Sequence, residues 1–394
     1  MTATPPPSTE VAVVGGGVVG LALAWRLAER GRRVTVLERE AVGRGASYAA
    51  AGMLAPAAEI QFEEADLYRL GRESLRRWPA FARDLEAASG IGVDYRGEGT
   101  LVVADDRDAA EALRRLYRFQ QDHGVPVEWL TGAEAREIEP MLSPRLAAAV
   151  HSPEDHQVDN RRVLEALRVA AERAGVTVRE QTPVRAVEPN ATRPAVVTGE
   201  GERIEASAVV LAAGAWVRSI DGIEPAPPVR PVKGQMLSLQ MERPFELRHV
   251  VRGPDAYLVP KSDGRLVVGA TSEEQGFDTA LTAGGLYRLL EAAVEVVPGI
   301  EELKVTETWA GLRPASRDHA PLIGTAAPGV VLAAGHYRHG VLLTPVTAAE
   351  LALDIDSALA ETTERGASGY SVPETSEWLA PFAPARFDPA FPDS

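Results

Sequence analysis

Residues 11–20 read VAVVGGGVVG, and this stretch decides the fold. Its first four residues, Val11–Val14, are small and apolar, which is typical of a buried strand in a parallel sheet. A run of glycines follows, and apolar residues then recur at helical spacing up to Gly31, a suitable residue to end a helix. The stretch therefore predicts a strand, a tight turn and a helix.

A second apolar run, Val34–Leu37, predicts another buried strand and ends at Glu38. Together with the G-x-G-x-x-G spacing, this order is the βαβ fingerprint of a dinucleotide site. Gly15 permits the tight turn, Gly17 lets the backbone approach a pyrophosphate, and Gly20 lets helix and strand pack closely. The helix N-terminus offers N–H groups to the phosphates. A carboxylate at the ribose disfavours a 2′-phosphate, so the pattern argues against NADP.

Composition narrows the class of protein further. A chain of 394 residues suggests two domains. Its net charge of −15 repels phosphate backbones, so nucleic acid is not an expected partner. The sequence has no cysteine, which excludes disulfides, thiolate metal sites and a cysteine-linked cofactor. We find no signal peptide or membrane-spanning run and expect a cytoplasmic protein.

Strand-to-glycine junctions recur near residues 214 and 335, so we expect one cofactor domain built from separated pieces with a second domain inserted between them. The fold class is α/β (α+β), with a Rossmann-like parallel sheet and an antiparallel-sheet substrate domain. We expect the proline-containing tail beyond about Ala360 to be an extended arm or partly disordered. The expected divisions are 1–90, 150–225 and 315–365 for the cofactor domain, 91–149 and 226–314 for the substrate domain, and 366–394 for the tail.

Two segments favour FAD over NAD. Residues 44–54 are mostly small, which suits close passage beside a long cofactor, although an Ala-rich core helix explains this run equally well. Gly335–Gly340 ends a strand and leads into a helical run. A helix N-terminus aimed at a flavin stabilises the negative charge that reduction places on the ring.

These segments resemble the FAD-dependent D-amino acid oxidase superfamily, and within it most closely the glycine oxidase family of thiamine biosynthesis. The similarity runs from residue 11 to about residue 350. The segments that carry it are Gly15–Gly20 with Glu38 and Arg39, Ser47–Met53, Pro231–Gly234, Ala256–Pro260, Gly264–Thr271, Trp309–Pro314 and Ala334–Leu343.

The resemblance implies non-covalently held FAD, and it assigns roles to residues of this chain. Besides the glycines at 15, 17 and 20, it implies these FAD contacts: Val18, Val19, Glu38, Arg39, Ala46, Ser47, Ala51, Gly52, Met53, Val184, Gly214, His336, Tyr337, Arg338, His339, Gly340, Val341 and Leu342. Substrate contacts are expected from Tyr257, Arg313, Arg338 and Met53.

The residues themselves suit an amino acid substrate. An arginine is the natural clamp for a carboxylate, because its planar fork makes two parallel hydrogen bonds. Arg313 lies between apolar residues, so it either binds such a ligand or forms an internal ion pair. The hydroxyl of Tyr257 can also donate to a carboxylate, although a purely structural tyrosine is an alternative. No histidine shows metal-ligand spacing, so we expect no metal.

We expect oxidation of glycine by hydride transfer from the substrate α-carbon to flavin N5, with no certain catalytic base from the protein. The imine is hydrolysed or passed on, and O2 is reduced to H2O2. A thiazole synthase is a possible partner, and a homo-oligomer is expected by analogy. Asp255 stands where the family has histidine and Ser272 where it has methionine, which puts strict glycine preference in doubt.

Three alternatives remain open at this point. A D-amino acid or sarcosine oxidase or dehydrogenase of the same superfamily fits the same motifs. An NAD-dependent dehydrogenase uses the same βαβ unit. The third alternative is a non-catalytic flavin-binding or assembly protein, and the convergence of the arginine and the tyrosine argues against it.

Overall fold

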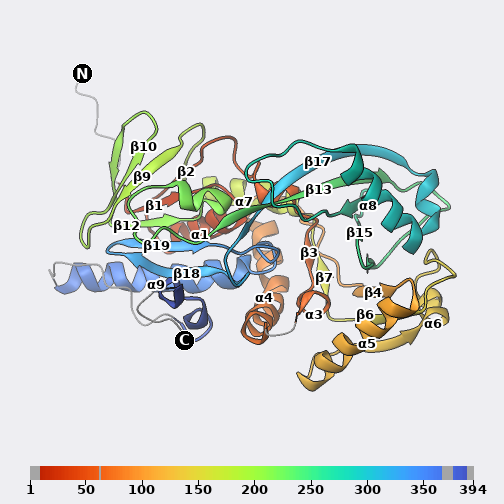
Figure 1. The fold of residues 1–394 in the computed structure, drawn as a ribbon. Coiled ribbons are helices and arrows are strands. Elements are labelled where there is room, and N and C mark those ends of the chain that lie inside the picture. The colour runs from red at the N-terminus through yellow and green to blue at the C-terminus, as the bar shows by residue number, and fades with distance from the viewer. Residues whose placement is uncertain (1–8, 62–63, 366–375, 388–394) are drawn as a thin grey trace.

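The computed structural model describes residues 9–61, 64–365 and 376–387, and two large sheets dominate it (Figure 1). The first sheet has six strands in the order β18-β19-β12-β1-β2-β8. Its neighbours run parallel except β18 and β19, which form an antiparallel hairpin. The strands are β1 (Val11–Val14), β2 (Val34–Leu37), β8 (Thr177–Arg179), β12 (Ala208–Leu211), β18 (Leu322–Ala327) and β19 (Val330–Ala334).

Both faces of this sheet are covered, which explains the uninterrupted apolar run of β1. Val11 and Val13 belong to the core beneath the helices, whereas Ala12 and Val14 belong to the core on the opposite face. The opposite face is covered by a three-stranded antiparallel sheet, β9 (Val184–Glu188), β10 (Ala195–Thr198) and β11 (Arg203–Glu205). The helices are α1 (Val18–Glu29), α4 (Ala65–Ser89), α7 (Asn160–Arg173) and α9 (Thr344–Arg365).

The second large sheet has eight strands in the order β17-β13-β16-β15-β14-β4-β6-β5, and only β4 and β14 run parallel. Figure 1 shows it beside the first sheet, with α8 (Ala283–Val296), α5 (Arg107–Asp122) and α6 (Gly132–Ile138) around it. Its strands are β4 (Thr100–Ala104), β5 (Glu128–Thr131), β6 (Ala148–Ser152), β13 (Arg230–Gln240), β14 (Val250–Arg252), β15 (Tyr257–Pro260), β16 (Arg265–Gly269) and β17 (Lys304–Ala315).

A short segment connects the two halves. It contains α2 (Ala46–Ala49), β3 (Met53–Leu54) and α3 (Pro56–Glu59), and β3 pairs antiparallel with β7 (His156–Gln157). In Figure 1, β3 and β7 lie between the two large sheets. The run of small residues is therefore one helical turn followed by a strand, and not a long Ala-rich helix.

The expected fold class is confirmed by a parallel sheet combined with antiparallel sheets. The residue bounds of the two domains remain a prediction. The expected extended arm is wrong for residues 376–387, which form the short helical turns η3 (Ala380–Phe382) and η4 (Pro384–Phe387). The side chains of Leu379 and Phe382 are buried in the core there. The prolines at 373, 389 and 392 lie outside the described residues.

Candidate active site

A cavity of about 820 Å³ lies where the two large sheets meet. Its walls come from the carboxyl ends of β1, β2, β12 and β19, and from the facing strands β13, β15 and β17. Open parallel sheets bind ligands at this edge, and the volume is at the upper end for small-molecule sites. The cavity can therefore hold a ligand as long as a dinucleotide.

The glycine turn forms one end of the cavity. Gly15, Gly17, Val18 and Val19 line it, but Gly20 does not. A Cβ at Gly20 would lie 2.0 Å from the carbonyl oxygen of Gly15, so this glycine allows helix α1 to pack against the turn. The close packing at Gly20 agrees with the fingerprint, whereas the approach of Gly17 to a pyrophosphate remains a prediction.

Glu38 also lines the cavity, at the end of β2. Its carboxylate accepts hydrogen bonds from the amide of Gly16, at 2.7 Å, and from the amide of Glu40, at 3.0 Å. Ser47 contributes its hydroxyl oxygen, which accepts from the amide of Val18 at 3.1 Å. The acid that would bind ribose is therefore fixed by backbone donors before any ligand arrives.

Stacked aromatic and guanidinium groups lie at this end of the cavity, and no sequence pattern predicts them. The guanidinium of Arg39 lies 3.5 Å from the ring centroid of Trp216. Trp216 in turn stacks on Phe277, with 5.5 Å between the ring centroids. All three residues line the cavity, as do Val184 and Gly214.

The segment of small residues forms the cavity wall between the glycine turn and the substrate end. Its predicted cofactor contacts all line the cavity, and these are Ala46, Ser47, Ala51, Gly52 and Met53. Their small side chains keep the backbone itself at the cavity surface. The glycine turn, Glu38 and this wall together fit FAD.

The late segment after β19 is only partly at the cavity. His336, Tyr337, Arg338, Gly340 and Val341 line it. The helical run predicted after this segment is present as α9.

His339 and Leu342 are not among the lining residues. Leu342 is buried in the core, and its carbonyl oxygen accepts from Trp78 Nε1 at 2.9 Å. His339 Nδ1 lies 3.6 Å from Glu59 Oε2, and burial lowers the pKa of His339 to about 4. The structure therefore gives these two residues supporting positions behind the wall.

Arg313 and Tyr257 come together at the other end of the cavity, from strands β17 and β15. Arg313 Nη1 donates to the carbonyl oxygen of Thr271 at 3.0 Å, and no carboxylate lies within 4.0 Å of the guanidinium in the described part of the chain. Gly234 makes the room, because a Cβ there would lie 2.6 Å from the guanidinium. Burial raises the pKa of Tyr257, and the nearby charge of Arg313 opposes that rise.

Arg338 is less available than Arg313. It lines the cavity, but its Nη2 lies 3.7 Å from Glu64 Oε1. Its Nε is buried and has no acceptor among residues 9–61, 64–365 and 376–387. The cation of Arg338 is thus partly neutralised, whereas that of Arg313 is not.

Glu59 is a cavity residue that the sequence reading missed. It is buried, lines the cavity, and lies 3.3 Å from Arg252 Nη1. The available signal was a single acid within the apolar run of residues 55–60. Behind it, the fully buried Asp155 accepts from the amides of Ala57 and Ala58 at 3.1 and 3.0 Å, and burial raises the pKa of Asp155 to about 8.

Asp255 and Ser272, the two departures from the family pattern, are both exposed and do not line the cavity. Neither side chain sets the width of the site directly. In the described residues, no group of three or more His, Cys, Asp or Glu side chains is arranged to hold a metal ion, and no helix is long and apolar enough to cross a membrane.

The comparisons with known proteins agree with this geometry. A family model described as FAD dependent oxidoreductase matches residues 10–353. The chain is 38% identical to a glycine oxidase of Geobacillus kaustophilus over 342 residues, which cover 86% of this chain and 90% of that protein. The crystal structure of glycine oxidase from Geobacillus kaustophilus has a TM-score of 0.83, with 36% identity and coverage of 96% of this chain and 98% of the other.

Two further relatives widen the comparison. The chain is 36% identical to a bifunctional ThiO/ThiG protein of Synechocystis sp., covering 87% of this chain but only 51% of that protein. The chain thus spans about half the length of this bifunctional relative. The structure of an iminodiacetate oxidase from Chelativorans sp. has a TM-score of 0.79 at 28% identity, covering 95% of this chain and 99% of the other. The chain belongs to the family of FAD-dependent oxidoreductases whose members include the glycine oxidases.

Proposed function

We propose that this chain is an FAD-dependent oxidase of glycine. The observation that carries the proposal is the pairing of Arg313, which has no carboxylate partner in the described residues, with Tyr257 at the far end of the cofactor cavity. A cation and a hydroxyl placed together suit a small carboxylate. Relatives at 32–38% identity that are named glycine oxidase support the choice of substrate.

Arg313 and Tyr257 bind and orient the substrate carboxylate, which presents the α-carbon to the cofactor. Bound FAD would supply the acceptor for the two electrons of the oxidation, with O2 as their final acceptor. The overall reaction converts glycine, O2 and water into glyoxylate, ammonia and H2O2. We assign no base to the protein, because the free amine of the substrate already carries the electron pair that the reaction needs.

The bifunctional relatives support a partner for the product. Their chains are about twice as long as the part that this chain matches, and they bear a name that joins ThiO to ThiG. We therefore propose that the imine formed from glycine is supplied to a thiazole synthase. We also propose a homo-oligomer, by analogy with related oxidases. A cytoplasmic location is proposed because a sequence without cysteine suits a reducing compartment.

A D-amino acid or sarcosine oxidase is the second candidate. It is favoured by the likeness to an iminodiacetate oxidase, whereas Asp255 and Ser272 lie outside the cavity lining and do not support it directly. Oxygen consumption with glycine, sarcosine, D-alanine and D-proline as substrates separates the candidates. The proposal requires the highest kcat/KM for glycine, and a higher value for any of the others would replace it.

A further inference from the structure

Lys261 follows β15 and is buried, with only 2% of its surface exposed. Its Nζ donates to the carbonyl oxygens of Ala51 and Val158, both at 2.7 Å, and lies 3.4 Å from Gln157 Oε1. Ala51 belongs to the cavity wall, and Lys261 itself does not line the cavity. This side chain therefore reaches from the eight-stranded sheet to the back of the cofactor wall.

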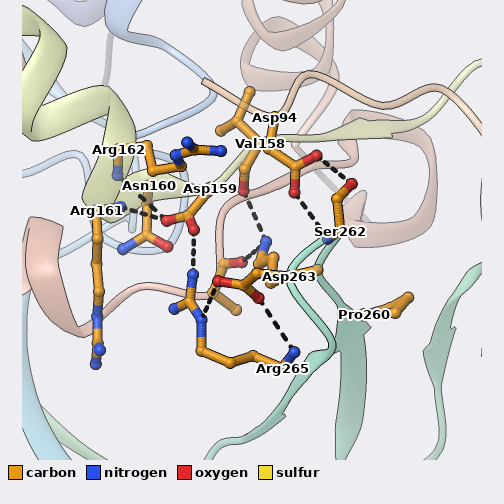
Figure 2. A network of polar contacts seen from close by, with 12 residues as sticks. Asp94, Val158, Asp159, Asn160, Arg161, Arg162, Pro260, Ser262, Asp263 and Arg265 are labelled. Atoms are coloured by element: carbon orange, nitrogen blue, oxygen red, sulfur yellow. Dashed lines mark hydrogen bonds and ion pairs between the residues drawn. The ribbon is translucent and has the colours of Figure 1, made fainter. Parts of the chain in front are cut away.

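Among the described residues, no carboxylate forms an ion pair with the Lys261 ammonium. The two acids whose charges act on Lys261 have other partners: Asp159 pairs with Arg265, and Asp94 accepts from Ser262, as Figure 2 shows. Within the described part of the chain, no acid lies within 4.0 Å of Nζ. Burial lowers the pKa of Lys261 to about 7, although Asp159 and Asp94 oppose that effect. Burying a cation that is bound only by carbonyl oxygens costs free energy. A functional role for Lys261 would explain why this cost is accepted.

The reason lies in the peptide between Ala51 and Gly52. This peptide is trans, so its C=O and N–H point in opposite directions. The carbonyl points to Lys261, and the amide N–H of Gly52 therefore points away from Lys261. The next carbonyl, that of Gly52, accepts from the amide of Val158 at 2.9 Å, so the segment is fixed on both sides. No hydrogen bond uses the Gly52 amide among the described residues.

A side chain at position 52 is incompatible with this arrangement. A Cβ on Gly52 would lie 2.1 Å from the carbonyl oxygen of Val158 and 3.2 Å from Lys261 Nζ. Only glycine fits at position 52, where the backbone lies between Lys261 and the cavity. Gly52 lines the cavity, and its amide N–H has no acceptor within the described part of the chain.

We propose that Lys261 is a positioning residue that holds the Ala51–Gly52 peptide with its amide N–H directed at the bound flavin. A fixed donor there stabilises the negative charge that the ring gains when it accepts electrons, at no cost of reorganisation. The proposal depends on the FAD cofactor alone and is independent of which amine is oxidised.

Lys261→Met tests this on FAD-saturated protein, because methionine keeps the length of the side chain and removes its donors. Sulfite adds to flavin N5 and leaves negative charge on the ring, so its Kd, read from flavin absorbance, reports the stabilising donor. We expect the sulfite Kd to rise at least tenfold. Lys304→Met is the matched control, because Lys304 is exposed and pairs with Glu242 at 2.7 Å, and its sulfite Kd should not change.

A purely structural role for Lys261 would lower thermal stability but leave the sulfite Kd of the FAD-saturated variant within twofold of the unmodified protein, and that result would overturn the proposal. If Lys261→Met does not fold, Lys261→Gln is measured in the same way, since glutamine retains one neutral donor. An intermediate rise in sulfite Kd is then expected, and no rise again contradicts the proposal.

Discussion

Arg313 carries the most specific expectation at the scale of a single residue. Its guanidinium faces the cavity beside Tyr257 and has no acid to neutralise it in the described residues. A charge-assisted hydrogen bond contributes about 1.5–3 kcal/mol. Arg313→Ala should therefore raise KM for glycine tenfold or more, with a smaller change in the Kd for FAD.

Steady-state kinetics and a fluorescence titration of FAD measure these two quantities separately. Arg83→Ala is the control, because the side chain of Arg83 is 74% exposed and does not line the cavity. Unchanged kinetics in Arg313→Ala would remove Arg313 from the substrate site and leave the partly paired Arg338 as the other arginine expected to contact the substrate.

The residues that could be predicted are those whose role follows from a local pattern. Gly15, Gly17 and Glu38 could be placed at a dinucleotide site because a strand, a turn and a helix set their relative positions, and all three line the cavity. Other contacts at the cavity join chain segments that are distant in sequence. Examples are the place of Glu59 in the lining and the stack of Arg39, Trp216 and Phe277. Nothing in one sequence shows that such segments meet, so these contacts required the structure.

At the scale of an element, helix α1 packs closely against the glycine turn that follows β1, with Gly20 next to the backbone of Gly15. Gly20→Ala places a Cβ 2.0 Å from a backbone oxygen that cannot move without distorting the glycine turn. Such overpacking costs about 1–3 kcal/mol. We expect this loss in the free energy of unfolding, measured in urea, together with weaker FAD binding.

Gly284→Ala provides the comparison, because no atom lies within 4 Å of a Cβ at that position in α8. It should keep or slightly raise stability, since alanine is the better helix former. Equal stability of the two variants would mean that the turn adapts, and the packing role given to Gly20 would fail.

Local periodicity also explains which elements were anticipated. The strands β1, β2, β12 and β19 are short apolar runs that end at polar residues or glycine, and they were expected. The three-stranded sheet β9–β11 was not, because β9 and β11 are partly exposed and only the short strand β10 has an unbroken apolar run. The 376–387 turns were missed for a related reason: proline content indicated an extended chain, whereas the burial of Leu379 and Phe382 depends on β18 and the helices nearby.

At the scale of the whole molecule, buried histidines make stability depend on pH. Burial lowers the pKa of His336 and of His339 to about 4, against 6.5 for an exposed histidine. Between pH 6.5 and 4 the unfolded chain binds these protons and the folded chain does not. The contribution of these two histidines to stability is therefore lost as the pH falls through this window, by on the order of 3 kcal/mol for each site. The buried Asp155 acts in the opposite sense, because its pKa is raised to about 8, so the histidine contribution is read from the difference between a variant and the unmodified protein.

Urea unfolding at pH 7 and pH 5 measures this loss. His336→Gln should reduce the dependence, because one of the two proton-linked groups is gone. A pH profile that is the same in the variant and the unmodified protein would show that His336 does not contribute.

The whole architecture places a dinucleotide cavity from one sheet beneath an arginine and a tyrosine from the other. The most direct test of glycine oxidation is the absorbance spectrum of the FAD-loaded protein under anaerobic conditions, before and after glycine is added, and again after air is admitted. The account predicts a flavin band that bleaches with glycine and returns with oxygen. A flavin band that glycine leaves unchanged, while sarcosine or a D-amino acid bleaches it, would contradict glycine as the substrate.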